Sequence, residues 1–333
     1  MNVRRHRISG IPGIALAATA ALGLGSLTAC SSDTAAAGNT DKFDVVASFY
    51  PMAFLAEQIG GDHVKVTSLT EPGQEPHDLE ISAKQTAQLQ ESDAALYLKG
   101  LQPSVDEAIT QSGIKTKIDA ASLTSLEEHG TEVGEHADEH AGEHADEHAD
   151  EHGHSHEGEG GKDPHIWLDP VKYAEVAEGV GKAFEKADPD HAADYKKNTE
   201  ALVKRLGELN TKFETGLKNT DTKVFITTHA AFGYLAERYG LTEEAISGLD
   251  PESEPSAARV KDLATMAKAD GVSTVFYETL VSDKTAKTLA KDARLKTDVL
   301  DPLEGITDKS RGDDYFQVME ANLKALQQAL GAK

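Results

Sequence analysis

The chain has 333 residues, a formal net charge of −24 and a single cysteine. With one cysteine it forms no internal disulfide, so the fold has to be stabilised by its apolar core. Acidic residues outnumber basic ones 57 to 33, and no basic stripe is present to bind a phosphate backbone, which excludes nucleic acid as a partner. Thirteen of the acidic residues lie in one segment, 127–161, which contains no lysine or arginine.

The N-terminal residues predict export and lipid attachment. Three arginines precede a short apolar run at 11–24, which is too short for a stable membrane span. The sequence LTAC, which ends at Cys30, resembles a lipobox, so residues 1–30 are predicted to be a lipoprotein signal peptide with a lipid on Cys30. An ordinary cleavage site beside an incidental cysteine is the alternative. The small polar residues of 31–42 then form a flexible tether.

From residue 43 short apolar runs alternate with helical stretches. Strands are predicted at 43–49, 63–69, 94–98 and 115–118, and helices at 52–60, directly after Pro51, and at 82–91. Strands that alternate with helices in this way are typical of parallel sheets with helices on both faces.

A long helical segment, 170–219, separates this first block from a second block of the same kind. Its apolar residues recur at helical spacing, and Asp188-Pro189 marks a break or a new helix start inside it. Strands are predicted after it at 223–227, 245–247, 272–278 and 297–300. The sequence therefore predicts an α/β fold with two lobes, 43–169 and 220–333, joined by the helical segment.

A histidine-rich and acidic insertion, 127–162, interrupts the first lobe and is predicted to be disordered. It holds eight of the fourteen histidines: His129, His136, His140, His144, His148, His152, His154 and His156. One hypothesis is an auxiliary, low-affinity zinc-collecting loop, because imidazoles among carboxylates attract cations and helical i,i+4 pairs can chelate them. The alternative is a passive, solvated acidic loop.

Of the remaining histidines, three stand at strand ends or in proline-guided loops. His77 follows the second predicted strand, His165 lies in DPHIWLDP, and His229 follows the strand at 223–227. Asp301 ends the last predicted strand in the same manner, and three imidazoles with one carboxylate can close a tetrahedral metal shell. His6, His63 and His191 lie in the signal peptide or in exposed turns. No HExxH, CxxC or GxSxG motif indicates catalysis.

The segments EPHDLEISAKQTAQLQESDAALYLKGLQPSVDEAI, DPHIWLDP, THAAFGYLAERYG and LDPLEGITD resemble, taken together, the metal-binding solute receptors of ABC importers. The resemblance is greatest to the zinc-uptake receptors, in a group that also holds manganese receptors and adhesion lipoproteins. It implies two α/β lobes joined by a long rigid helix, with the metal in the cleft between them. It assigns the ligands to His77, His165, His229 and Asp301, with Glu75 and Glu278 as supporting or substitute oxygen donors.

The resemblance also implies a function. The chain is expected to be an extracytoplasmic, lipid-anchored and monomeric receptor that delivers Zn²⁺ to an ABC permease and its ATPase. Three nitrogen ligands favour zinc over manganese, which prefers oxygen donors. The manganese receptors that the chain resembles have two histidines and two carboxylates. A manganese receptor and a metal-stabilised surface adhesin remain the alternatives. A zinc hydrolase is disfavoured, because four protein ligands leave no open position for a catalytic water.

Overall fold

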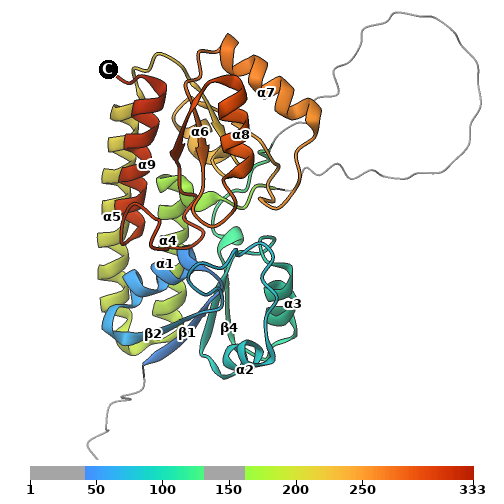
Figure 1. Cartoon of the computed structure of the whole chain (residues 1–333). Coiled ribbons are helices and arrows are strands. Elements are labelled where there is room, and N and C mark those ends of the chain that lie inside the picture. Colours follow the sequence, from blue (N-terminus) through green and yellow to red (C-terminus); the bar gives the residue numbers. More distant parts are fainter. Residues whose placement is uncertain (1–41, 131–161) are drawn as a thin grey trace, which may run out of the picture. The chain divides into compact units, whose positions relative to one another are not determined.

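A computed structural model describes residues 42–130 and 162–333, which form two parallel four-stranded sheets (Figure 1). The first sheet contains β1 (Phe43–Ala47), β2 (Val64–Ser68), β3 (Ala94–Tyr97) and β4 (Thr116–Asp119) in the order β2-β1-β3-β4. The second contains β5 (Val224–Thr227), β6 (Thr242–Ala245), β7 (Thr274–Tyr277) and β8 (Lys296–Val299) in the order β6-β5-β7-β8. The predicted two-lobed α/β fold is thereby confirmed.

One predicted strand was wrong. The strand expected at 245–247 shares only Ala245 with β6, which runs over Thr242–Ala245. Because β6 is an edge strand, its two glutamates, Glu243 and Glu244, are only half-buried and hide the strand from a search for apolar runs. The other predicted strands overlap the observed ones, with ends that differ by one or two residues.

Helices cover both faces of each sheet. One face of the first sheet packs on α1 (Tyr50–Gly60), and the other carries α2 (Ala83–Glu91) and α3 (Pro103–Gln111). In the second lobe α7 (Ala257–Ala269) and α8 (Lys284–Ala293) cover one face, while α9 (Tyr315–Leu330) packs towards the other. A short helix, α6 (Gly233–Arg238), follows β5. Local signals place these helices: Ser82, for example, forms a capping box with Gln85 at the start of α2.

The long helix predicted to join the lobes is present as α5 (Ala192–Leu217), and a shorter helix precedes it. α4 (Pro170–Ala187) ends at Asp188, a single 3₁₀ turn begins at Pro189, and α5 (Ala192–Leu217) returns along α4. α5 packs against both α1 of the first lobe and α9 of the second, as Figure 1 shows. The Asp-Pro break expected inside the helical segment is therefore present.

One apolar core extends through both lobes and the connecting helices. It includes Phe54 of α1, Trp167 beside α4, Phe213 of α5, and Tyr315 and Met319 of α9. The ring of Phe54 stacks on that of Tyr315 with 5.3 Å between the centroids, which joins the first lobe directly to the last helix. Burial on this scale stabilises the relative position of the lobes, because separating them would expose these side chains to water.

No helix within residues 42–130 and 162–333 is long and apolar enough to cross a membrane. The predicted signal peptide, the lipid site at Cys30 and nearly all of the tether lie outside the described residues. The same holds for most of the insertion, 131–161, which contains seven of the eight histidines predicted to form the collecting loop.

Candidate metal centre

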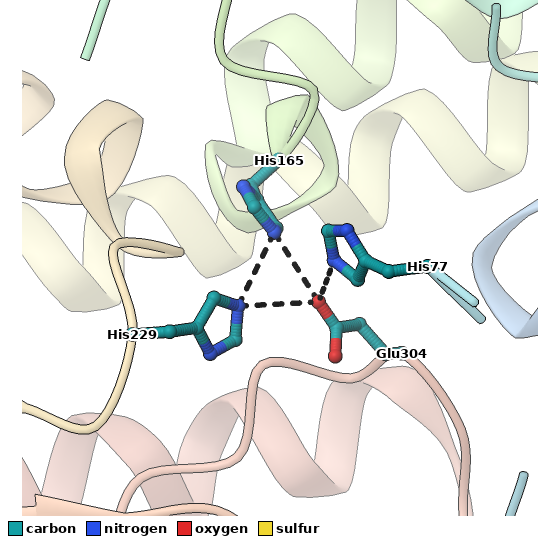
Figure 2. A group of neighbouring side chains, drawn as sticks. All are labelled: His77, His165, His229 and Glu304. Atoms are coloured by element: carbon teal, nitrogen blue, oxygen red, sulfur yellow. Dashed lines mark hydrogen bonds and ion pairs between the residues drawn. The ribbon is translucent and has the colours of Figure 1, made fainter. Parts of the chain in front are cut away.

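Four side chains from both lobes converge on one point (Figure 2). His77 lies in the loop after β2, His165 opens the 3₁₀ turn before α4, and His229 follows β5. The fourth is Glu304, in the loop after β8. Parallel sheets present their ligands at the carboxyl ends of the strands, and three of these residues follow such ends.

The donor atoms are spaced as the corners of a small polyhedron. Glu304 Oε1 lies 3.1 Å from His77 Nε2, 3.2 Å from His165 Nε2 and 3.4 Å from His229 Nε2. The Nε2 atoms of His165 and His229 are 3.4 Å apart. A tetrahedron with zinc–nitrogen bonds of about 2.0–2.1 Å has edges of about 3.3–3.4 Å, so these separations suit one four-coordinate ion.

The centre is buried, and one of its oxygens has no hydrogen-bond partner among the described residues. The side chains of His165, His229 and Glu304 are at most 1% exposed, while that of His77 is 12% exposed. Glu304 Oε2 is buried and accepts no hydrogen bond from the described residues. Because an unpaired buried carboxylate oxygen is costly, this orphan oxygen also favours a cation at the centre.

Carboxylates behind the histidines fix which nitrogen faces the centre. Asp163 Oδ1 lies 2.7 Å from His165 Nδ1 and also accepts the backbone N–H of His165. Glu278 Oε1, directly after β7, lies 2.6 Å from His229 Nδ1 and accepts the hydroxyl of Thr228. With Nδ1 held by a carboxylate, Nε2 of each ring points inwards as a ligand, the usual arrangement around protein-bound zinc.

In the absence of metal two imidazoles, those of His165 and His229, retain protons because their pKa values are raised. Burial alone would lower the pKa of His165, but Asp163 and Glu304 outweigh it and raise that pKa to about 9. The pKa of His229 is likewise raised against the effect of burial, by Glu278 and Glu304. Burial would raise the pKa of Glu304, yet the three histidines hold it well below its ordinary value. Two imidazolium charges therefore occupy the position that suits a divalent cation.

Asp301, expected as the fourth ligand, does not reach the cluster. Its Oδ1 accepts the backbone N–H of Leu303 at 2.9 Å, and its Oδ2 accepts the hydroxyls of Ser310 and Thr279. Leu303 is a buried leucine with a φ of 60°, a strained left-handed conformation. Asp301 thus holds the tight turn that presents Glu304, three residues further on.

The sequence favours Asp301 as the ligand because it is the first carboxylate after the strand, and Glu304 stands three residues beyond it. The signal that could have found it is its setting, PLEGI, in which a lone carboxylate stands among apolar residues and glycine. A carboxylate is buried in such surroundings only when a cation or several donors compensate it. Trp167 Nε1 also donates to the carbonyl of Pro302 at 2.7 Å, which ties this turn to the segment that carries His165.

The supporting oxygen donors predicted from the sequence lie next to the cluster. Glu278 holds His229 as described, and Glu75 Oε1 accepts the backbone N–H of His77 at 3.0 Å. Burial and the neighbouring Glu304 carboxylate raise the pKa of Glu75 to about 8. Of the insertion's histidines only His129 is described, and it lies outside the cluster, against Asp163 and Glu237.

Several known proteins are similar to this chain over most of its length. The "Zinc-binding lipoprotein AdcA" of Streptococcus pneumoniae is 36% identical over 311 residues, or 91% of this chain, which spans only 58% of AdcA. The "High-affinity zinc uptake system protein ZnuA" of Bacillus subtilis is also 36% identical, over 93% of this chain and 98% of that protein.

Solved structures agree with these relatives. The Zn(II)-bound ZnuA-like domain of S. pneumoniae AdcA matches with a TM-score of 0.69 and 33% identity, over 87% of this chain and 99% of the domain. The laminin-binding protein of Streptococcus agalactiae is described as an adhesin with metal transporting activity. It matches with a TM-score of 0.72 and 29% identity, over 86% of this chain and 99% of that protein. The family model for the zinc-uptake complex component A of the periplasm, ZnuA, matches residues 45–329, and the chain belongs to this family.

Proposed function

We propose that this protein is an extracytoplasmic receptor that binds Zn²⁺ with high affinity at His77, His165, His229 and Glu304 and delivers it to an ABC importer. The observation that carries the proposal is the buried cluster of three imidazole nitrogens around one carboxylate oxygen, at tetrahedral spacing. The names of the relatives from S. pneumoniae and B. subtilis support the same metal and the same role.

The donor set favours zinc over manganese. Manganese prefers more oxygen ligands and a higher coordination number, whereas this centre offers three nitrogens and one glutamate. The isolated site should also accept Co²⁺, Ni²⁺ and Cu²⁺, because these ions bind such donors more tightly than Mn²⁺ does in the Irving–Williams order. Selection of zinc in the cell then depends on metal supply and on the transporter.

The remaining parts of the proposal concern location and partners. A lipid on Cys30 would anchor the chain to the outer face of the cytoplasmic membrane, with residues 31–42 as the tether. A permease and its ATPase would take up the metal from a monomeric receptor. We further propose that the histidine-rich insertion collects zinc weakly for the centre, and its two ends meet close to His165, where the Asp163 N–H donates to the Glu127 carbonyl at 2.9 Å.

A competition titration of the full chain with Zn²⁺ and Mn²⁺ tests the metal assignment. We expect one tight zinc equivalent that manganese does not displace and that disappears when His77, His165 or His229 is replaced by alanine. Excision of residues 129–156 should remove several weak equivalents and leave the tight one. Preference for manganese would replace zinc in the proposal, and loss of the tight equivalent on excision would refute the assignment of the centre.

Growth under zinc chelation separates the receptor from the two other candidate functions. Deletion of the gene should impair growth when zinc is chelated, and a chain with His229→Ala should fail to restore it. An adhesin would instead show weaker attachment with unchanged growth. A zinc hydrolase would need an open coordination position, which four protein donors do not leave.

A further inference from the structure

A second group of ligating side chains lies at the base of the insertion. It consists of Glu127 and His129, at the start of the insertion, and Glu237 of α6. One ligand atom from each lies within 4.8 Å of the others. His129 Nε2 is 3.0 Å from Glu237 Oε2. We propose that these three side chains form a second divalent-cation site, distinct from the centre between the lobes and not dependent on its function.

The ring of His129 is held in a fixed orientation. Its Nδ1 lies 2.9 Å from Asp163 Oδ2, and its ring makes a T-shaped contact with that of Tyr234, with 4.5 Å between centroids. A Cβ on Gly233 would lie 2.5 Å from the Cβ of His129, so only glycine at this position permits the ring to come so close. With Nδ1 engaged by a carboxylate, Nε2 is presented to the two glutamates as a ligand.

The two glutamates supply oxygen donors at an accessible position. Lys172 Nζ lies 2.7 Å from Glu127 Oε1 and holds that side chain in place, while the side chain of Glu237 is 60% exposed. All three members line a cavity of about 530 Å³. One nitrogen and two carboxylate oxygens suit Zn²⁺ and its neighbours, and three protein donors leave a position open to water. The second site should therefore bind more weakly and exchange faster than the buried centre.

Asp163 joins the two sites. Its Oδ1 contacts His165 of the buried centre, and its Oδ2 contacts His129 of the second site. The backbone bond from Asp163 to Glu127 places both ends of the insertion at this point. A cation bound by His129 would thus lie one carboxylate away from a ligand of the buried centre, at the place where the insertion leaves and rejoins the fold.

Titration with Zn²⁺ alone tests the second site in the full chain. To remove competing donors, seven histidines of the insertion are replaced by glutamine: His136, His140, His144, His148, His152, His154 and His156. This parent chain should bind one tight and one weaker zinc equivalent. Glu237→Gln should weaken the second equivalent by at least about tenfold and leave the first unchanged. Gly233→Ala should have the same effect, because it displaces the ring of His129 without removing a ligand.

Glu128→Gln is the matched control. Glu128 is exposed, adjacent in sequence and part of the wall of the same cavity, but it is not a member of the cluster. Glu128→Gln therefore removes the same charge as Glu237→Gln without removing a ligand. A parent chain with a single equivalent, or equal effects of Glu237→Gln and Glu128→Gln, would show that the group is only an ion-pair network. The tight equivalent, measured in the same titration and abolished by His229→Ala, reports separately on the buried centre.

Discussion

The two groups of ligating side chains use similar donors but differ in their exposure to solvent. At the centre between the lobes three histidines surround one glutamate, and only His77 is more than 1% exposed. At the base of the insertion one histidine meets two glutamates, of which Glu237 is largely exposed. Burial removes water as a competing ligand and strengthens electrostatic interactions, so the same residue types should give a tight site in one place and a labile one in the other.

The two groups also differ in the elements that carry their donors. His165 and His229 of the centre each have a buried carboxylate on Nδ1, and strand ends fix the backbone beside His229 and Glu278. His129 has one such carboxylate, but the donors facing its Nε2 come from a loop and from a short surface helix. Preorganisation is therefore concentrated where the ion has to be retained.

The largest expected effect comes from removing a histidine of the buried centre, with removal of His129 as the comparison. His229→Ala should weaken the tight zinc equivalent by more than about 100-fold, beyond what the loss of an outer partner costs. His129→Ala should change the same equivalent by less than about tenfold, since it contacts the centre only through Asp163. Competition with a chelator of known affinity measures both variants. Equal losses would show that the two groups form a single site.

A second pair of variants compares Glu304 with Asp301. Glu304→Gln should weaken zinc binding by more than about tenfold, because a charged ligand is lost from a buried centre. Asp301→Asn should leave the affinity within a few-fold but lower the free energy of unfolding by about 1–3 kcal/mol, since Asp301 accepts three hydrogen bonds around the strained Leu303. Zinc titration and urea unfolding separate the two outcomes. The reverse pattern would restore Asp301 as the ligand.

Smaller effects should follow from the carboxylates behind the histidines. Glu278→Gln should weaken the buried centre by about 10–100-fold and leave the second site unchanged. Asp163→Asn should weaken both sites, because Asp163 contacts both His165 and His129. Titration of the chain with the glutamine-substituted insertion distinguishes these patterns. An effect of Asp163→Asn on only one site would contradict the shared role.

The apparent affinity for zinc should depend on pH. His165 has a pKa of about 9 without metal, so zinc has to displace its proton at neutral pH, and the apparent affinity should rise with pH up to about 9. Binding near pH 7 should release about two protons, one each from His165 and His229, which calorimetry in buffers of different ionisation enthalpy measures. Affinity that is independent of pH would show that the rings are neutral before binding.

The same pKa shifts determine the stability of the metal-free chain. Because the pKa of His165 is raised above its ordinary value of 6.5, its stabilising contribution is complete below pH 6.5 and is lost as the pH rises through about 9. The pKa of Glu75 is raised to about 8, so its contribution to the stability of the folded chain also falls as the pH rises from 4.5 to 8. The gain in melting temperature on adding zinc should therefore increase from pH 6.5 to 9.

The fold was predictable because strand and helix alternate clearly in the sequence, and three of the four clustered side chains stand at recognisable places. His229 follows a buried strand, and His165 lies in a proline-guided loop. Glu304 was not predictable in the same way, because its position depends on a left-handed turn at Leu303 that no sequence periodicity encodes. The edge strand β6 was misplaced because three of its four residues, Thr242, Glu243 and Glu244, are polar.

The second group was hidden for a different reason. His129 was assigned to the histidine-rich insertion by its neighbours in sequence, whereas its contacts are with Asp163 and Glu237, 34 and 108 residues away. Only the fold brings α6 to the base of the insertion. Density of histidines in a sequence indicates metal chemistry, but it does not locate the positions where side chains converge.

The partial exposure of His77 has a consequence for how quickly an ion can leave. The other three members of the cluster are buried, and one apolar core joins the lobes, so opening the lobes as a hinge would be slow. His77 instead lies in a loop between β2 and α2 that has no regular secondary structure. The bond to His77 should therefore be the last to form and the first to break, and the residence time of the ion becomes a property of this loop rather than of the two lobes.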